Sequence, residues 1–289
     1  MVDRPGFVVR AADASVDELL CGAWQQRVET LLAGLRASGD WRLFAGPLRL
    51  EIAESPPAHA GLGSGTQLGM ALARALSELS GEPGLTAVDM ARRARRGLRS
   101  ALGLYGFEQG GLLVEAGQRR PGEISPLVAR VDFPDCWRFV LARPLGATGL
   151  AGTDELNGFA QLTAMPQATT DRLCRIALME ILPAVIEQDF TQASESIGRF
   201  GRLVGEYFAP VQGGVFADER MRGVARVLES RGIHGFGQSS WGPSLFVLCP
   251  DSESASQLAT DLAQGPAGAG CEFTIAAPLN QGAAVEVSG

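Results

Sequence analysis

The residues best suited to chemistry form a glycine-rich stretch near residue 60. It combines alternating glycines with hydroxyl and amide side chains, in the order Gly61, Gly63, Ser64, Gly65, Thr66 and Gln67. Glycine lacks the Cβ atom that would keep a phosphate away from the backbone, and serine and threonine add hydroxyl donors. Because an apolar helical pattern follows, the free N–H groups of a helix start would converge here on an anion. The stretch is therefore predicted to bind phosphate, with a tight packing turn as the alternative interpretation.

The same stretch does not match the two best-known nucleotide motifs. A P-loop ends in Gly-Lys-Ser/Thr, but the chain contains no lysine at any position. The dinucleotide-binding pattern needs a third glycine that is replaced here, and no clear strand–helix unit leads into it. The lack of lysine also excludes Schiff-base catalysis and a pyridoxal phosphate anchor. Arginine, a permanently charged planar fork suited to phosphate and carboxylate, is the basic residue left for such roles.

A second stretch, residues 99–111, brings a carboxylate close to aromatic and basic side chains. Tyr105 and Glu108 lie between glycines in what we expect to be a loop before a strand. Glu108 is predicted to ligate Mg²⁺ or accept a ribose hydroxyl, and Tyr105 or Phe107 to form a wall for an aromatic ring. A hairpin turn with a solvated glutamate is the alternative. Arg99 ends a helix crowded with arginines and is predicted to bind phosphate or carboxylate bidentately, although a solvated helix face also explains the cluster.

A third stretch offers hydrogen-bond donors and a flat aromatic surface between two glycines. Its members are Gln238, Ser239, Ser240 and Trp241. A packed turn is the alternative interpretation of these residues. His59 and His234 each adjoin a glycine stretch, and isolated histidines of this kind are more often structural than catalytic. Asp154 and Glu155 could supply a further carboxylate, with a solvated helix cap as the favoured interpretation.

Hydrophobic periodicity predicts the elements that must position these stretches. Strands are predicted at residues 7–10, 48–52, 110–115, 138–141, 244–248 and 272–276. Helices are predicted at residues 15–35, from the glycine stretch to about 80, and at 86–99, 169–188, 191–207, 218–231 and 252–264. A stretch rich in Gly, Pro and Thr at residues 143–153 is the best candidate boundary. We therefore expect two domains, 1–145 with mixed α and β structure, and 146–289 as a small α+β sandwich.

Composition limits the kinds of partner. The chain has 289 residues, a net charge of −7 and an isoelectric point near 5.0, which disfavour nucleic acid because phosphate neutralisation needs a basic surface. No apolar run is long enough for a membrane span, and the first residues do not resemble a secretory signal, so we expect a cytoplasmic protein without membrane partners. The five cysteines are scattered, which argues against a disulfide framework or a zinc site.

Three blocks, in order along the chain, carry a resemblance to a known family. Residues 57–67 resemble the glycine motif of GHMP kinases, and their Gly-Thr-Gln ending is closer to β-ribofuranosylaminobenzene 5′-phosphate synthases. Residues 99–114, with the sequence Leu-Tyr-Gly-Phe-Glu-Gln-Gly-Gly in their centre, resemble the characteristic stretch of that synthase family. Residues 235–244 lie where GHMP proteins carry their C-terminal glycine motif. The chain is therefore similar to this synthase family, within the GHMP kinase superfamily, over roughly residues 55–280.

The resemblance implies an α+β, GHMP-kinase-like fold of two domains, the first like ribosomal protein S5 and the second a ferredoxin-like sandwich. It implies an enzyme that joins phosphoribosyl pyrophosphate to 4-amino- or 4-hydroxybenzoate in methanopterin-type pterin biosynthesis, releasing pyrophosphate and carbon dioxide. Mg²⁺ is then the expected ion, no organic cofactor is expected, and the partners are small-molecule substrates, with a homodimer left open. Members usually begin with a further strand and polar segment, so we expect residues 2–7 to lie inside the family's first region.

Two other functions fit the same residues. An ATP-dependent small-molecule kinase would use the glycine stretch to hold ATP phosphates, because phosphoryl transfer needs a clamp on the γ-phosphate and a positioned metal ion. A catalytically inert relative would use the same stretch to bind a phosphorylated sugar without releasing pyrophosphate. Thermal shift with ATP or phosphoribosyl pyrophosphate would separate these classes, since a specific ligand stabilises the folded state by mass action.

Overall fold

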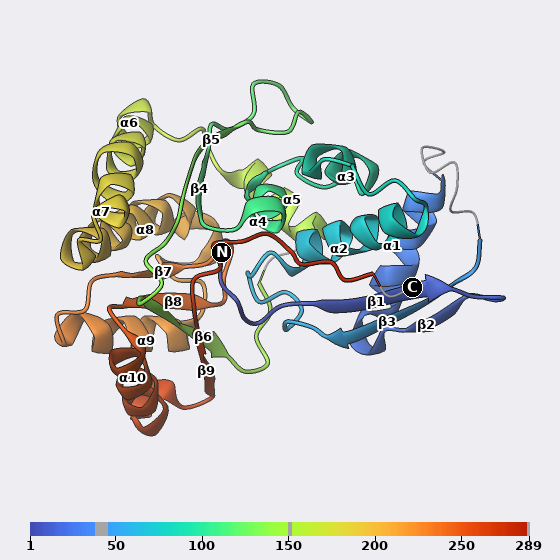
Figure 1. Cartoon of the computed structure of the whole chain (residues 1–289). Coiled ribbons are helices and arrows are strands. Elements are labelled where there is room, and N and C mark those ends of the chain that lie inside the picture. The colour runs from blue at the N-terminus through green and yellow to red at the C-terminus, as the bar shows by residue number, and fades with distance from the viewer. Residues whose placement is uncertain (38–45, 150–151, 288–289) are drawn as a thin grey trace.

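The N-terminal half is built on a three-stranded sheet with α1 and α2 packed against it (Figure 1). The computed structural model describes residues 1–37, 46–149 and 152–287. The strand order is β1–β3–β2, with β1 antiparallel and β2 parallel to β3. The elements are β1 (Val8–Asp13), β2 (Glu18–Leu20), α1 (Gln25–Ala37), β3 (Leu48–Glu54), α2 (Ser64–Leu79), α3 (Ala87–Arg93) and α4 (Leu102–Gln109).

Alternation and helical spacing of apolar residues explain this half. Leu48 and Leu50 lie on one face of β3 and are fully buried, and the apolar stripe of α2, which includes Leu68, Leu72 and Leu76, packs into the same core. The glycine stretch leads from β3 into α2, so this core fixes the position of the helix start. A two-stranded antiparallel ribbon follows, formed by β4 (Leu112–Glu115) and β5 (Leu127–Val131).

The C-terminal half contains a four-stranded antiparallel sheet in the order β7–β8–β6–β9. Helices α9 and α10 pack on one face, and α6, α7 and α8 on the other, as Figure 1 shows. The elements are β6 (Arg138–Pro144), α5 (Gly152–Gln161), α6 (Gln167–Ile176), a π-helical turn (Ala177–Ile181), α7 (Leu182–Ile186), α8 (Phe190–Gln212), α9 (Glu219–Ser230), β7 (Phe236–Gln238), β8 (Leu245–Cys249), α10 (Ser252–Gln264) and β9 (Cys271–Ala276).

Glycines on one side of α8 let neighbouring backbone lie directly on the helix. A Cβ atom added at Gly198 would overlap the carbonyl of His234, and one added at Gly205 would lie 2.6 Å from the carbonyl of Val215. At Gly201, an added Cβ would come within 3.4 Å of the carbonyl of Phe236, so it would be tight. Gly198 and Gly201 therefore let the chain at residues 234–236 lie against α8, and Gly205 does the same for Val215, in the connection from α8 to α9.

The segment after β9 crosses back to the N-terminal half. The N–H of Ala283 donates to the carbonyl of Phe107 (2.7 Å), which ties the segment to the end of α4. The Asn280 side chain exchanges two hydrogen bonds of 2.8 Å with the backbone N–H and carbonyl of Phe133. Figure 1 shows this last segment running across α4 toward α2. In the described residues, no helix has both the length and the apolar character that a membrane crossing needs.

Several predicted elements are confirmed. The helix at residues 252–264 has the predicted bounds as α10, because the Asp251 side chain accepts from the N–H of Ser254 and caps its start. The long helix predicted at residues 169–188 is α6 and α7, joined by the π-helical turn before Pro183. The predicted division at residue 145 stays a prediction, and β6, which ends at Pro144, pairs with strands of the C-terminal half.

The helix predicted at residues 15–35 is wrong in its first part. Residues 18–20 form β2, which pairs with β3, and the α-helix begins only at Gln25. Contacts with residues distant in the sequence explain this difference. Asp17 accepts hydrogen bonds from Arg36 (2.7 Å) and from the N–H of Leu48 (3.0 Å), which holds this segment at the sheet edge and overrides the capping pattern.

Two further predictions near the second stretch are corrected. The helix predicted to reach Arg99 ends at Arg93, and Arg95 has a left-handed backbone with φ of 50°. The arginines are therefore spread over a helix and a loop rather than along one helix face. The expected loop at residues 105–111 is instead mostly helical, since α4 continues to Gln109 and only the glycines after it turn the chain.

Candidate functional site

The start of α2 presents unused backbone donors. Gly63 caps the helix in a left-handed conformation with φ of 68°, and its carbonyl accepts from the N–H of Thr66 at 3.0 Å. Among the described residues, the N–H groups of Ser64 and Gly65 meet no acceptor. Gly63 is exposed, while Ser64 is only 7% exposed. The helix start is therefore open above Gly63, and its two free N–H groups and its dipole favour an anion there.

The third stretch lies directly against the glycine stretch. The Ser239 hydroxyl donates to the carbonyl of Gly61 at 2.7 Å, and the N–H of Gly149 donates to the carbonyl of His59 at 2.8 Å. Gly61 has a φ of 76°, and a Cβ atom there would lie 2.6 Å from the carbonyl of Gly242. Glycine is needed at this position because two backbones meet. The fold thus joins two motifs that are far apart in the sequence.

The side chain of Gln238 holds the third stretch in shape. Its oxygen accepts from the N–H of Ala217 (2.7 Å), and its nitrogen donates to the Gln212 side chain (2.9 Å) and the Ser240 carbonyl (3.1 Å). These bonds use the hydrogen-bonding capacity that a ligand would need. The contacts are those of a packed turn, so Gln238 acts here as a support.

Trp241 packs inward instead of offering a flat surface. It is 5% exposed, and its ring meets Phe208 at 4.6 Å and Phe159 at 5.0 Å between centroids, both edge to face. Ser240 is exposed, with a left-handed φ of 55°. Of the third stretch, Ser239 therefore lies at the glycine stretch and Ser240 faces solvent.

The second stretch reaches the site through the start of α4. The Gln67 side chain donates to the carbonyl of Gly103 at 2.8 Å, and a Cβ atom at Gly103 would lie 2.8 Å from the Thr66 side chain. The starts of α2 and α4 are therefore neighbours. Tyr105 is half-buried, and its hydroxyl donates to the carbonyl of Ser125 at 2.9 Å, so the ring belongs to the packing of this half.

Glu108 lies at the other end of α4. One oxygen accepts from the N–H of Ala87 at 3.0 Å, which caps the start of α3, and the other accepts from the Gln109 side chain at 3.1 Å. The described residues contain no group of three or more Asp, Glu, His or Cys side chains suited to a metal ion. Glu108 thus lies at the opposite end of α4 from the glycine stretch, its role as a magnesium ligand stays a prediction, and no chemical step here is derived through Mg²⁺.

Two arginines from other elements lie along the side of α2. A Cβ atom at Gly65 would overlap the guanidinium of Arg27, and one at Gly69 would lie 3.1 Å from Nε of Arg96. The Nε atoms of both arginines are buried without an acceptor. Every other half-buried arginine in the described part of the chain has an ion pair or a hydrogen-bond acceptor, and Arg27 and Arg96 have neither. Burial and the nearby charges of Arg27 and Arg99 lower the pKa of Arg96.

Arg99, predicted to bind substrate, pairs with a carboxylate of α5. Its Nη1 lies 2.5 Å from an oxygen of Glu155, and the Arg99 side chain is 46% exposed. An exposed pair of this kind contributes about 0–1 kcal/mol, so an incoming anion can displace it at little cost. Arg27 was not predicted. The predicted helix began at residue 15, which placed Arg27 in its middle, so no signal in the sequence distinguished this arginine from one on a solvated helix face.

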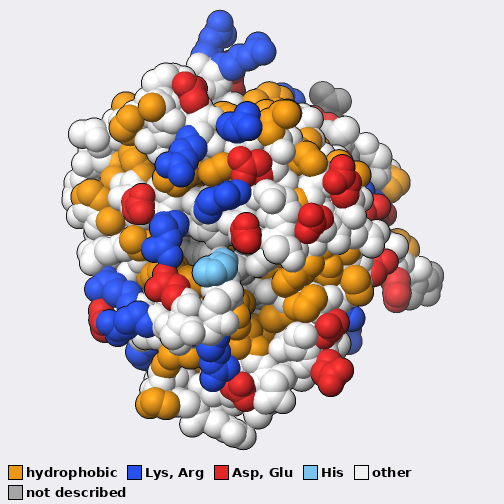
Figure 2. All heavy atoms as spheres, turned by 90° about the vertical axis from the view of Figure 1, so that its left-hand side faces the viewer, with side chains coloured by type: hydrophobic (Ala, Val, Ile, Leu, Met, Phe, Trp, Pro, Cys, Tyr) orange, Lys and Arg blue, Asp and Glu red, His pale blue; other side chains and the backbone are white. Residues whose placement is uncertain are grey.

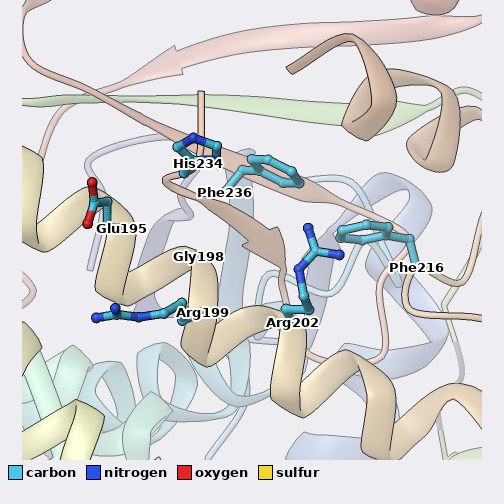
Figure 3. Close-up of a pocket in the computed structure, with 7 residues that line it drawn as sticks. All are labelled: Glu195, Gly198, Arg199, Arg202, Phe216, His234 and Phe236. Carbon is cyan, nitrogen blue, oxygen red and sulfur yellow. The ribbon is translucent and has the colours of Figure 1, made fainter. Parts of the chain in front are cut away.

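Two cavities lie away from the glycine stretch, in the C-terminal half. The first, of about 280 Å³, is lined by Glu195, Gly198, Arg199, Arg202, Phe216, His234 and Phe236. Figure 3 shows the Arg202 guanidinium beside the Phe216 ring. Arg202 pairs with Glu229 at 2.5 Å, and Arg199 pairs with Glu180. On the face drawn in Figure 2, basic and acidic side chains are intermixed around a hollow beside a histidine. The charges of this cavity are balanced, so it does not select an anion.

The second cavity, of about 450 Å³, lies between the connection from α5 to α6 and the C-terminal half of α8. Its walls are mainly apolar, with Leu162, Pro166 and Leu203 among them. Neither cavity contains the free N–H groups and unpaired guanidinium groups found beside α2. The candidate site is therefore the start of α2 with the arginines next to it.

Comparison with known proteins places the chain among related sequences. The family described as the GHMP kinases N terminal domain matches residues 27–106. The β-ribofuranosylphenol 5′-phosphate synthase of Methanothermobacter thermautotrophicus is 34% identical over 212 residues, covering 66% of this chain and 60% of the relative. The protein of the same name from Archaeoglobus fulgidus is 30% identical over 250 residues, covering 82% of this chain and 76% of the relative. The chain thus spans less than two thirds of the Methanothermobacter relative.

Solved structures show the same fold at low identity. A homoserine kinase from Cytophaga hutchinsonii superposes with a TM-score of 0.64 at 15% identity, over 97% of this chain and 88% of that structure. A mevalonate diphosphate decarboxylase from Staphylococcus aureus superposes with a TM-score of 0.65 at 16% identity, over 96% of this chain and 86% of that structure. These likenesses confirm the predicted α+β fold of the GHMP type.

Proposed function

Because this chain belongs to the β-ribofuranosylphenol 5′-phosphate synthase family, we propose that it joins phosphoribosyl pyrophosphate to a 4-substituted benzoate. The products are the ribosylated ring, pyrophosphate and carbon dioxide. The relatives are named for a phenol product, which is what 4-hydroxybenzoate yields after losing its carboxylate. 4-Hydroxybenzoate is therefore the first substrate to test, and 4-aminobenzoate the second.

The proposed reaction moves three electron pairs. The bond between the anomeric carbon and the pyrophosphate oxygen breaks, and its electrons leave with pyrophosphate. The ring carbon that carries the carboxylate supplies the pair for the new bond to the anomeric carbon. The bond from that ring carbon to the carboxylate then breaks, and its electrons restore the aromatic ring as carbon dioxide leaves. The protein must therefore stabilise an anionic leaving group beside a carbon with cationic character.

One observation supports this assignment most directly: the start of α2 has free N–H groups at Ser64 and Gly65 for one anionic group, and the unpaired guanidinium of Arg27 beside the same helix suits a second. Hydrogen bonds to charged oxygens contribute roughly 1.5–3 kcal/mol each, whereas the helix dipole adds about 0.3–1 kcal/mol. Direct donors would therefore carry most of the binding of pyrophosphate. Because these donors are fixed by the helix, they need little reorganisation as charge develops on the leaving group.

The decisive experiment supplies phosphoribosyl pyrophosphate, carboxyl-labelled 4-hydroxybenzoate and Mg²⁺, and measures labelled carbon dioxide and pyrophosphate together. We expect carbon dioxide and pyrophosphate to be released in a one-to-one ratio. A parallel reaction with 4-aminobenzoate tests which benzoate is used, and one with a chelator tests the need for Mg²⁺. Pyrophosphate without carbon dioxide would mean hydrolysis of the donor and would contradict the proposal. Conversion of ATP to ADP with a small alcohol would instead support a kinase.

Glu108→Gln tests the predicted catalytic role of that residue without removing its structural contact. The glutamine oxygen can still accept from the N–H of Ala87, so α3 keeps its cap while the charge is lost. A role in binding Mg²⁺ predicts that turnover falls and that more Mg²⁺ is needed for half-maximal rate. Unchanged turnover with unchanged Mg²⁺ dependence would leave Glu108 with the capping role alone.

A further inference from the structure

Helix α2 carries a bare strip on the side that faces Arg27 and Arg96. Gly65 and Gly69 are one turn apart, and each is covered by a guanidinium group in place of a side chain of its own. Glycine inside a helix costs about 1 kcal/mol relative to alanine, so local helix stability does not favour these two residues. Gly65 makes room for the guanidinium of Arg27, and Gly69 for the stem and Nε of Arg96, beside the backbone of the first two turns.

The charges gathered at this strip are not balanced by protein groups. Arg27 and Arg96 lie against neighbouring turns of α2, at Gly65 and Gly69, and the charge of Arg99 acts on Arg96 together with that of Arg27. Within the described residues, Arg99 forms an ion pair with Glu155, whereas Arg27 and Arg96 form an ion pair with no carboxylate. Among the described side chains, the cluster therefore has an excess of two positive charges. Clustered like charges that are partly desolvated are unfavourable unless an anion joins them.

We propose that Arg27, Arg96 and Arg99 form a subsite for a phosphate monoester on the side of α2, separate from the N–H groups at the helix start. A phosphate monoester carries close to two negative charges at neutral pH, which matches the excess in the cluster. Guanidinium groups bind such oxygens through paired hydrogen bonds. Resting on the proposed function, this subsite takes the 5′-phosphate of the ribosyl donor, while the free N–H groups of Ser64 and Gly65 take its pyrophosphate.

Binding of two simple probes tests the subsite independently of turnover. Ribose 5-phosphate represents the monoester and inorganic pyrophosphate the leaving group, each titrated by calorimetry at fixed salt. Arg27→Met and Arg96→Met remove the charge and keep an apolar stem. We expect each to weaken ribose 5-phosphate at least about 10-fold, the loss of one charge-assisted contact, and to change pyrophosphate binding less than about 3-fold.

Arg92→Met is the matched control. Arg92 lies close in the sequence but is exposed and pairs with Asp89 at 3.6 Å on the surface of α3, so its loss should leave both affinities unchanged. Gly65→Ala provides a second route to the same end, because the added methyl group displaces Arg27 while every charge remains. Gly65→Ala should reproduce the selective loss of ribose 5-phosphate binding, and it remains a test of the subsite if a methionine variant does not fold.

Three results would overturn the inference. The first is wild-type protein that does not bind ribose 5-phosphate. The second is unchanged ribose 5-phosphate affinity in folded Arg27→Met and Arg96→Met. The third is an equal loss of both probes, which would assign the arginines to the helix start. Failure of the proposed function looks different, because carbon dioxide release would then be absent while selective binding of ribose 5-phosphate still depended on the arginines.

Discussion

Replacing Gly61 by alanine tests whether the two glycine motifs depend on direct contact between their backbones. Gly61 has a φ of 76°, and an added Cβ atom would overlap the carbonyl of Ser239 and lie 2.6 Å from that of Gly242. Gly63 is the matched control, with a φ of 68° and no described atom within 4 Å of its added Cβ. Both variants carry the backbone strain, but only Gly61→Ala carries the overlap.

The expected sizes follow from these contacts. A left-handed alanine costs about 1–2 kcal/mol, which sets the effect of Gly63→Ala on the free energy of unfolding. In Gly61→Ala, relief of the overlap adds about 1–3 kcal/mol. Movement of the third stretch would also lose the hydrogen bond from Ser239 to Gly61, for about 0.5–1.5 kcal/mol more. Gly61→Ala should therefore be less stable than Gly63→Ala by about 2 kcal/mol or more.

Denaturant titration without ligand measures this difference from the two midpoints, provided that the slopes of the two variants agree. Ser239→Ala is an additional check, since it removes the hydroxyl contact and leaves the backbones in place. Its loss should not exceed about 1.5 kcal/mol. If Gly61→Ala and Gly63→Ala unfold at the same denaturant concentration, the close approach of residues 61 and 239–242 does not contribute to stability, and the reasoning is wrong.

Three other predictions use contacts outside the site. The hydrogen bond from Arg36 lowers the pKa of Asp17 to about 2, so the Asp17 carboxylate stabilises the fold above the unfolded pKa of 3.8 and ceases to do so as pH falls toward 2. In an acid titration, Asp17→Asn should therefore lose less stability than the wild type between these two pH values. Asn280→Ala removes two bonds to Phe133 and should cost about 1–3 kcal/mol, with faster proteolysis after β9 as the local readout. Burial raises the pKa of Cys249 to about 11, so mass spectrometry should find it alkylated after the two exposed cysteines; equal rates would contradict this.

The glycine stretch and its helix could be predicted because local signals agree. Apolar residues at helical spacing follow the stretch and predict a helix that starts within it, and α2 does begin at Ser64. Motif order also sufficed for the α+β fold, although not for its details. Strand β5 was not predicted, since it belongs to a short ribbon whose Val128 is 55% exposed and shows little alternation.

The missed parts depend on contacts that sequence order does not show. Helix α4 contains glycines and aromatic residues of low helix propensity, and tertiary packing of Leu104 forms it. Arg27 is far from the glycine stretch in sequence, so only the folded chain reveals it beside Gly65. Trp241 could not be separated from a substrate-stacking residue by composition, because burial against Phe159 and Phe208 is what decides its role.

The glycines of α8 also determine how accurately the site is assembled. Side chains can change rotamer to absorb a small shift, but a peptide group resting on a helix backbone has no such freedom. The position of the chain at His234 and Phe236 is therefore set by α8, and Ser239, a few residues later, inherits that position where it meets Gly61. The backbone of α8 thus fixes the position at which the two motifs meet.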